Sequence, residues 1–313
     1  MDATRAEVIA AAFALGTPTA PPRFVARGAM GEIWQVVTDG GERWAVKELF
    51  DWAEVDDRPR DVDFQTAAAA AGIHLPRPRP APDGRFVVDR TRVYEWADLG
   101  PLMTGPVDDA TAGEVGGILG RLHALAMAPA PGEEVDDWYR IATSTEELAA
   151  LAERGGALGR PWADALHERL PLLADLCDLV ATSPMRTDDV IVCHCDLTID
   201  NVFRPATGGP LVVIDWENAG PLSAESELAA TLAAWVTPAT AAPLLRGYVE
   251  AGGTAIIRGP ESFAADTATT LNYLRVLAEQ SIEDDGHRDF AEPRLIRLLT
   301  DTLSQAGPRG WTA

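Results

Sequence analysis

The sequence predicts an α+β fold of two lobes, in which a small lobe built on a β-sheet with one helix precedes a larger, mainly helical lobe. Three observations lead to this prediction. Short apolar runs joined by turn signals fill the first third of the chain, helical patterns fill the rest, and a linker near residues 95–105 separates them. We therefore expect one domain at residues 1–98 and a second at residues 99–313.

The first third reads as strands connected by tight turns. The Asp39-Gly40-Gly41 run is typical of a hairpin, and Asp83-Gly84 marks a second turn. A helical pattern covers residues 61–71 and stops at Gly72, with prolines beyond it. We expect a five-stranded antiparallel sheet from the apolar runs at residues 23–25, 33–37, 43–49, 86–88 and 92–96.

Beyond Gly100 the apolar residues recur with helical spacing. Thr111 and Glu114 have the spacing of a capping box, and Pro161 opens a second helix. Two short apolar runs, at residues 190–193 and 211–214, interrupt this region and predict isolated strands.

Composition excludes several classes of protein. The formal charge of −22 disfavours a nucleic-acid partner, because a polyanion requires a basic surface, and it favours cations. The three cysteines are too few for a disulfide framework and indicate a reducing compartment. There is no membrane-spanning apolar run and no secretory signal pattern, so we expect a cytoplasmic protein with no membrane partner.

The strongest motif is His194-Cys195-Asp196-Leu197-Thr198-Ile199-Asp200-Asn201, which follows the apolar run at 190–193. Phosphoryl transfer needs a carboxylate that orients the attacking hydroxyl, together with oxygen ligands for Mg²⁺. A loop that carries an aspartate and, five residues later, an asparagine can supply both.

A second acidic residue follows the next apolar run. Asp215 ends the sequence Leu211-Val212-Val213-Ile214 and precedes Trp216 and Glu217. Because Mg²⁺ prefers hard oxygen ligands and takes only one or two carboxylates, Asp215 is a candidate second ligand.

The motif HxDxxxxN followed by Ile-Asp-Trp-Glu resembles the aminoglycoside phosphotransferase and choline kinase superfamily, whose bilobal fold is protein-kinase-like. The resemblance implies a kinase that uses Mg²⁺ and ATP or GTP. It implies Asp196 as catalytic base, Asn201 and Asp215 as metal ligands, and His194 as a residue that braces the loop.

The N-terminal third supports the same resemblance. The turn Gly28-Ala29-Met30-Gly31 lies between two strands, where backbone N–H groups can meet phosphates, although a plain turn explains two glycines as well. Lys47, in Trp44-Ala45-Val46-Lys47, is similar to the strand lysine that contacts nucleotide phosphates in kinases.

Two further nucleotide contacts follow from the resemblance. The helix after Lys47 should offer it a carboxylate, and Asp61 and Asp63 are the choices; we favour Asp61, because Phe64 and Ala68 then define the buried face. The backbone of Glu95, Trp96 and Ala97 falls where the hinge between the lobes would bind the purine.

Substrate-binding candidates are Asp200 and Glu217, the latter for a substrate ammonium group. We interpret Glu225 and Glu227 as the acidic start of a helix, and His123 and His167 as half-exposed helical residues without special chemistry. Cys193-His194-Cys195 could suggest zinc, but a structural zinc site needs about four ligands.

Three functions therefore compete. The first is phosphorylation of a small, cationic molecule such as an aminoglycoside or basic peptide antibiotic, as in antibiotic resistance. The second is phosphorylation of a metabolite such as choline, homoserine or a sugar. The third is nucleotide binding without catalysis. A protein kinase is disfavoured, because no Ala-Pro-Glu segment follows Asp215. The sequence leaves the oligomeric state open.

Overall fold

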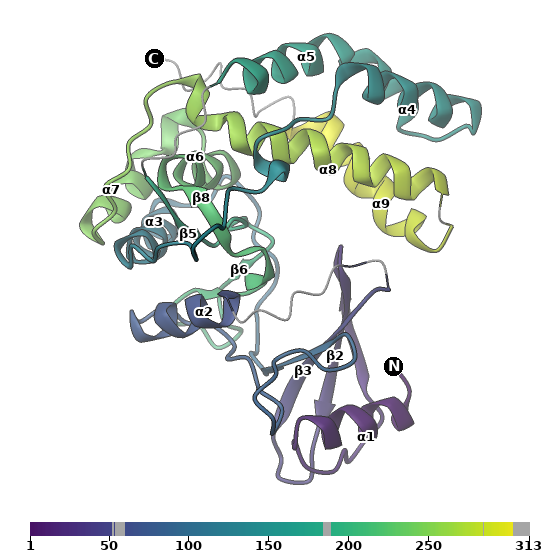
Figure 1. Cartoon of the computed structure of the whole chain (residues 1–313), viewed down its shortest axis with the longest axis vertical. Helices are drawn as coiled ribbons and strands as arrows, with labels where there is room; N and C mark the ends of the chain where they lie inside the picture. The colour runs from purple at the N-terminus through teal and green to yellow at the C-terminus, as the bar shows by residue number, and fades with distance from the viewer. Residues whose placement is uncertain (52, 54–59, 184–188, 284, 303–313) are drawn as a thin grey trace. The chain divides into compact units, whose positions relative to one another are not determined.

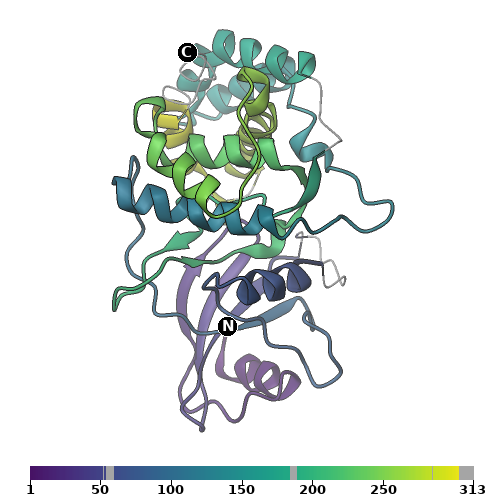
Figure 2. The same ribbon diagram turned by 90° about the vertical axis from the view of Figure 1, so that its left-hand side faces the viewer.

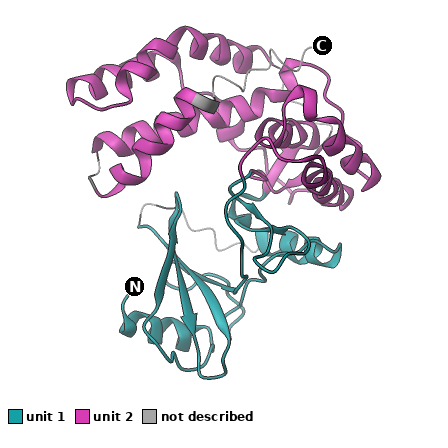
Figure 3. Cartoon of the chain, turned by 180° about the vertical axis from the view of Figure 1, so that it is seen from behind, with its two compact units in different colours: residues 1–103, 199–219 teal, residues 104–198, 220–313 magenta. Residues whose placement is uncertain are grey.

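The computed structural model describes residues 1–51, 53, 60–183, 189–283 and 285–302. It divides into two compact units (Figure 3). Unit 1 contains residues 1–103 and 199–219, and unit 2 contains residues 104–198 and 220–313. The chain has a small antiparallel sheet and a mostly helical part, as the sequence predicts.

The sheet of unit 1 has four antiparallel strands in sequential order. They are β1 (Arg23–Arg27), β2 (Gly31–Val37), β3 (Arg43–Leu49) and β4 (Thr91–Glu95). The expected fifth strand at residues 86–88 is absent from the described sheet: Val88 forms only an isolated bridge with Thr91. Between these two residues, Asp89 and Arg90 have φ angles of 47° and 58°, so the chain turns back before a strand can extend.

Two helices accompany this sheet (Figures 1 and 2). Helix α1 (Ala3–Ala12) is missing from our sequence prediction; it buries Ala6, Ile9 and Ala10 in one apolar cluster with Val36 and Val46 of the sheet. Helix α2 (Arg60–Ala70) is close to its prediction, and Gly72 follows it with a φ angle of +81°. Unit 1 thus has a core of its own.

Unit 1 also contains a hairpin from far along the chain. Strands β6 (Val202–Phe203) and β7 (Val212–Val213) pair with each other. The Val213 N–H donates to the His74 carbonyl over 2.9 Å, and the Gly100 N–H donates to the Arg204 carbonyl over 2.8 Å. These bonds attach residues 199–219 to unit 1, whereas our expected boundary placed everything after residue 98 in one domain.

Unit 2 is mainly helical. Strand β5 (Val190–Cys193) pairs with β8 (Gly220–Ser223). Helix α3 (Asp109–Ala124) is capped at its start by Asp108, whose carboxylate accepts the Thr111 N–H. The expected cap at Thr111 is therefore wrong. The described helices of unit 2 are α3, α4 (Thr145–Ala157), α5 (Ala163–Thr182), α6 (Ala224–Trp235), α7 (Ala242–Glu250), α8 (Ala264–Glu283) and α9 (Asp285–Arg297).

No described helix combines the length and the apolar character that crossing a bilayer requires.

Candidate active site

Lys47 is the buried centre of a charge cluster in unit 1. Its Nζ atom is 2.6 Å from Asp215 Oδ1 and 3.1 Å from Glu217 Oε1, and its side chain is only 10% exposed. Tyr94, on the neighbouring strand β4, donates its hydroxyl to Glu217 Oε1 over 2.7 Å. Residues remote in sequence therefore meet at one ammonium group.

The cluster changes the acidity of its members. Burial opposes the charge of Lys47, but Asp215 and Glu217 outweigh it and raise the pKa of the ammonium group. Burial raises the pKa of Asp215 to about 6, and Lys47 only partly offsets this. For Glu217, Lys47 and the surrounding donors outweigh burial and hold the pKa well below its usual range. Glu217 is thus the firmly ionised carboxylate of the pair.

Asp61 does not pair with Lys47 as we expected. Its carboxylate instead bonds to the Arg92 guanidinium and accepts a hydrogen bond from Gln65 over 3.3 Å. Arg92 is the register partner of Lys47 on strand β4, and its longer side chain reaches the buried Asp61. The side chain of Asp61 is one methylene shorter than the glutamate that we would expect at this position of α2, which explains why it does not reach Lys47.

Arg92 and Tyr94 are site residues that our sequence analysis missed. The two residues are separated by one position along β4, so their side chains point to the same face of the sheet. Arg92 is 7% exposed, which is rare for an arginine unless it is paired. The available signal was an arginine inside a short apolar run, together with a tyrosine two residues later.

The β6–β7 hairpin positions Asp215. The Ile214 N–H donates to the Asn201 carbonyl over 2.9 Å, so the two ends of the hairpin lie side by side. Asp215 has φ 61° and ψ 60°, a left-handed conformation that costs free energy for a residue with a side chain. Next to it, Trp216 is 2% exposed, stacks edge-on against Phe64 of α2, and donates to the Val213 carbonyl. The packed tryptophan holds the strained aspartate in place.

These residues have the chemistry that a magnesium ion requires. Asp215 offers carboxylate oxygens on a side chain that is 39% exposed, and Asn201 offers an amide oxygen from the same end of the hairpin. Hard oxygen donors, few in number, are the usual protein contribution to a Mg²⁺ site that is completed by phosphate and water.

The glycine turn is tightly closed. The Gly28 N–H donates to the Gly31 carbonyl over 2.8 Å, and the Phe50 N–H donates to the Met30 carbonyl over 2.9 Å. A Cβ atom on Gly31 would lie 2.2 Å from the Glu48 carbonyl oxygen, so only glycine fits this strand pair. Ala29 is half-buried within the turn.

Two of the three residues of the expected hinge, Glu95–Ala97, already use their backbone N–H groups in hydrogen bonds within unit 1. The Glu95 N–H donates to the Arg77 carbonyl over 2.9 Å, and the Trp96 N–H donates to the Arg43 carbonyl over 3.2 Å. Within the described part of the chain the Ala97 N–H has no such acceptor. The N–H groups of Glu95 and Trp96 are therefore already used within unit 1.

Asp196 belongs to unit 2, where strand β5 leads into the loop that carries it. Cys195 has a φ angle of +64°, His194 is fully buried, and the Asp196 N–H donates to His194 Nδ1 over 3.3 Å. Thr198 donates its hydroxyl to Asp196 Oδ1 over 3.4 Å. His194 is thus buried beside the loop and accepts a hydrogen bond from its backbone. Asp200, in unit 1, is exposed.

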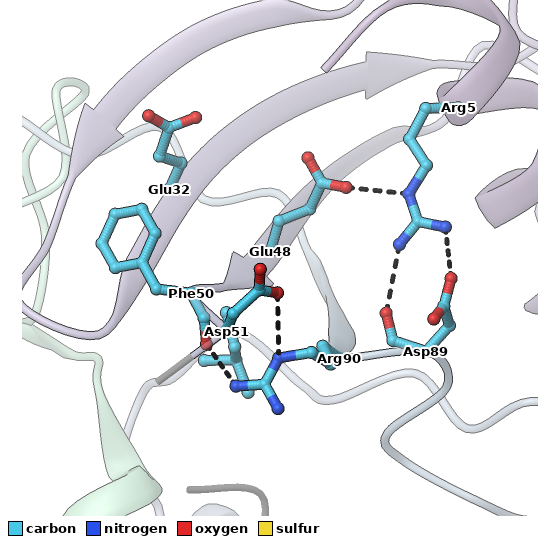
Figure 4. A pocket seen from close by; sticks show the side chains of 8 residues that line it. Arg5, Glu32, Glu48, Phe50, Asp51, Asp89 and Arg90 are labelled. Carbon is cyan, nitrogen blue, oxygen red and sulfur yellow. Dashed lines mark hydrogen bonds and ion pairs between the residues drawn. The ribbon is translucent and has the colours of Figure 1, made fainter. Parts of the chain in front are cut away.

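A polar pocket of about 350 Å³ lies elsewhere on unit 1 (Figure 4). Arg5 joins Glu48 and the Asp89 carboxylate there, at 2.9 and 2.5 Å, while Glu32 and Phe50 form another part of the wall. Glu48 follows Lys47 along β3, and successive strand side chains face opposite ways. This pocket therefore lies on the other face of the sheet from the Lys47 cluster.

The chain belongs to the phosphotransferase enzyme family, whose sequence model matches residues 23–265. Members of this family are small-molecule phosphotransferases. A search of the curated proteins found no match.

Solved structures show the same fold at low sequence identity. A spectinomycin phosphotransferase, crystallised with ADP and spectinomycin, matches with a TM-score of 0.70 and 11% identity over 97% of each chain. An amicoumacin kinase matches with a TM-score of 0.59 and 13% identity over 92% of this chain and 89% of its own. A choline/ethanolamine kinase family protein from Mesorhizobium loti has a TM-score of 0.52 and 16% identity, over 96% of this chain and 97% of its own. The fold is that of the kinase-like phosphotransferases.

Proposed function

We propose that this protein transfers the γ-phosphoryl group of ATP or GTP, with Mg²⁺, to a hydroxyl group of a small cationic molecule. The observation that carries the proposal is the buried Lys47 ammonium, which Asp215 contacts at 2.6 Å from a hairpin that also carries Asn201. A lysine with a raised pKa stays charged and can bind phosphate oxygens, while the oxygens of Asp215 and Asn201 suit a metal ion.

The proposed residues divide the chemistry as follows. Lys47 and the backbone of the glycine turn bind the phosphates, and Ala97 binds the purine. Asp196 accepts the proton of the substrate hydroxyl while the hydroxyl oxygen of the substrate forms a bond to the γ-phosphorus. The bond from that phosphorus to the oxygen that bridges it to the β-phosphate breaks, and the nucleoside diphosphate leaves. A magnesium ion held by Asn201 and Asp215 would neutralise phosphate charge.

The substrate class rests on charge. A net charge of −22 attracts cations and raises their encounter rate, which favours an amine-bearing antibiotic over a neutral sugar. Asp200 is exposed and remains a candidate for substrate contact. Glu217 is held by Lys47 and Tyr94, so a role in binding a substrate ammonium would compete with its place in the Lys47 cluster.

Two alternatives remain distinct proposals. Metabolite kinases, for example for choline or ethanolamine, share this fold, so the fold does not choose between them and the antibiotic kinases. A nucleotide-binding protein without catalysis would keep the Lys47 cluster but would not need Asp196.

A coupled assay of nucleotide consumption with Mg²⁺ tests these proposals. The panel comprises aminoglycosides, basic peptide antibiotics, macrolides, choline, homoserine and simple sugars. We expect turnover with an amine-bearing compound, and we expect Asp196→Asn to lower kcat by roughly 10²–10⁴-fold while nucleotide affinity is retained, because a general base contributes about that much. Full turnover in Asp196→Asn would contradict the mechanism, and nucleotide binding with silence across the panel would favour the non-catalytic alternative.

A further inference from the structure

The chain has a single lysine, and two carboxylates hold it. Among its 26 lysine and arginine residues, Lys47 is the only lysine. Its Nζ atom lies 2.6 Å from Asp215 Oδ1 and 3.1 Å from Glu217 Oε1. An ammonium group is a compact charge on a flexible stem, so the groups that contact it decide where it points. The two carboxylates differ in their surroundings, and this difference assigns them different roles.

Glu217 is fixed from several sides. Besides contacting Lys47, it accepts the Tyr94 hydroxyl over 2.7 Å, and its Oε1 atom lies 4.0 Å from Arg92 Nη1. Tyr94 and Arg92 both belong to β4, the strand that pairs with the strand of Lys47. The position of Glu217 is therefore set by the same sheet that carries the lysine.

Asp215 is the more accessible of the two carboxylates. Its side chain is 39% exposed, compared with 21% for Glu217, and it is the carboxylate that we propose for the metal ion. A carboxylate that turns toward Mg²⁺ gives up part of its contact with the lysine. Glu217 keeps its contacts with the sheet in that case, so Lys47 retains an ionic partner while Asp215 serves a metal.

The acid of α2 is occupied elsewhere. Asp61, which we expected to hold Lys47, bonds to the Arg92 guanidinium and accepts a hydrogen bond from Gln65 over 3.3 Å. Arg92 is buried, and its guanidinium carbon lies 5.7 Å from the centroid of the Tyr94 ring. Breaking a buried ion pair leaves a charge without water, which is costly. The pair therefore ties α2 to β4 and keeps Asp61 away from the lysine.

A short turn directs both acids to one ammonium group. Asp215 and Glu217 flank Trp216 at the start of a 3₁₀ turn. The indole of Trp216 is 2% exposed and packs edge-on against Phe64, with ring centroids 5.6 Å apart. Because the residue between them is anchored, the two carboxylates reach Lys47 from a fixed backbone.

Two other roles compete for Glu217. One is contact with the ammonium group of a substrate, as our sequence analysis considered, and the other is coordination of the metal ion, since Glu217 lies two residues from Asp215. Both roles require a carboxylate with oxygens to spare. Glu217 instead contacts a lysine, a tyrosine hydroxyl and an arginine within unit 1, which favours a role toward Lys47.

We propose that Glu217 is the positioning residue for Lys47, which fixes its ammonium group for the nucleotide phosphates, and that the Arg92–Asp61 pair ties α2 to the sheet instead of holding the lysine. This inference rests on the proposed function in one respect, namely that Lys47 binds nucleotide phosphates. It deepens that function by naming the residue that keeps Lys47 in place when Asp215 engages a metal ion.

The test compares Glu217→Gln with Glu48→Gln. Glu48 follows Lys47 on β3, faces the other side of the sheet and pairs with Arg5 at 2.9 Å (Figure 4), so its replacement removes an equally paired charge beside the lysine. Calorimetry with Mg²⁺ and AMP-PNP or GMP-PNP measures nucleotide affinity without turnover. We expect Glu217→Gln to weaken binding roughly 10- to 100-fold, because a bond to a charged group contributes that much. Glu48→Gln should stay within about twofold of wild type.

Asp61→Asn tests the other half of the proposal. It leaves Arg92 without its carboxylate, so we expect a lower free energy of unfolding, with nucleotide affinity close to that of wild type. A loss of affinity as large as that of Glu217→Gln would show that the acid of α2 holds the lysine after all.

The single lysine supplies a direct readout. In protein labelled with [¹³C]lysine, the Cε–Hε signals all come from Lys47. Its two Hε protons are distinct only if the side chain is held in one orientation. With Mg²⁺ and saturating nucleotide analogue, we expect two resolved Hε signals in wild type and in Glu48→Gln, and one averaged signal in Glu217→Gln. Two resolved signals in Glu217→Gln would overturn the proposal.

The remaining outcomes separate this proposal from the proposed function. If wild type binds neither analogue, both are wrong; if Glu217→Gln binds as tightly as wild type, only the role of Glu217 is wrong. A loss confined to the KM of an amine substrate, or one that excess Mg²⁺ reverses, would instead assign Glu217 to the substrate or to the metal. If Glu217→Gln does not fold, Tyr94→Phe removes the hydroxyl that donates to Glu217 and should weaken nucleotide binding roughly 2- to 10-fold. Wild-type affinity in that variant would then overturn the proposal.

Discussion

Asp266, in the first turn of α8, has a half-buried carboxyl group that makes no hydrogen bond or ion pair with the described residues. Burial raises its pKa to about 7, without an opposing cation. An aspartate kept protonated near neutral pH stabilises the folded protein in acid and opposes folding once it must ionise.

Replacement by asparagine should reveal this effect. The native group holds its proton up to about pH 7, whereas the unfolded chain releases it near pH 4, so wild type should lose stability between these values. We expect Asp266→Asn to match wild type below about pH 4 and to exceed it by on the order of 1–3 kcal/mol above pH 7. Urea unfolding across this range measures the difference.

Asp164→Asn is the matched control, because Asp164 also lies in the first turn of a helix but is exposed. It should show no comparable rise with pH. A constant difference between Asp266→Asn and wild type would contradict the expectation.

For single residues, the sequence indicated the members of the site correctly where the residue type and its position permit few roles. A lysine inside an apolar strand and an aspartate at a strand end indicated Lys47 and Asp215, and the two meet at 2.6 Å. The partner of Asp61 was predicted wrongly, because the choice depends on Arg92 lying opposite Lys47 in the β3–β4 register. Register is a property of the folded sheet that local sequence did not specify.

Among the elements, α3 and α7 approach each other closely through glycines. A Cβ atom on Gly116 would lie 2.0 Å from the Leu244 carbonyl oxygen, and one on Gly120 would lie 2.3 Å from the Tyr248 carbonyl oxygen. The missing side chains let the two backbones meet, and this proximity brings His123 within reach of the Tyr248 hydroxyl.

Adding a single methyl group should separate the helices. We expect Gly116→Ala to lower the free energy of unfolding by about 1–3 kcal/mol, the usual cost of overpacking. Gly117→Ala is the control, since the atoms nearest to its Cβ would be 3.9 Å away, and alanine should add about 0.5–1 kcal/mol there through helix propensity. Denaturant unfolding distinguishes the two; equal stability of the variants would refute the close-packing argument.

The sequence predicted the bounds of some strands correctly but missed one helix, and each outcome has a physical reason. Strand β3 and strand β5 have the predicted bounds, because each is an apolar run between clear breaks. Helix α1 was missed, since its stability derives from packing Ala6 and Ile9 against the sheet rather than from a strong pattern of its own. Glu225 and Glu227 lie in the first turn of α6, as predicted, but sequence position alone could not reveal that both carboxylates, and His123 of α3, are buried.

For the whole molecule, the charge of −22 gives a prediction about rate. If the substrate is a cation, the field of the protein accelerates encounter, and salt screens that field over about 10 Å at 0.1 M. We expect kcat/KM for a cationic substrate to fall several-fold between about 50 and 500 mM salt at fixed Mg²⁺ and nucleotide. A neutral substrate should show little change, and a cationic substrate without salt dependence would exclude steering.

The division of the chain into its two units could be predicted only in part from the sequence. A strand-rich first third and a helical remainder follow from periodicity, and both are present. That residues 199–219 pack with unit 1 depends on backbone bonds to His74 and Gly100, which join positions more than a hundred residues apart. Hydrogen bonds of that range leave no local pattern in the sequence.

The return of the chain to unit 1 has a consequence for modularity. The backbone crosses between the units after residues 103, 198 and 219, so unit 1 is not formed by one continuous segment of the chain. A fragment ending at residue 103 would keep Lys47 but lose Asp215, Glu217 and the buried Trp216 together. Gene fusion or fragment exchange at a single junction therefore cannot transfer the complete Lys47 cluster of unit 1 to another protein.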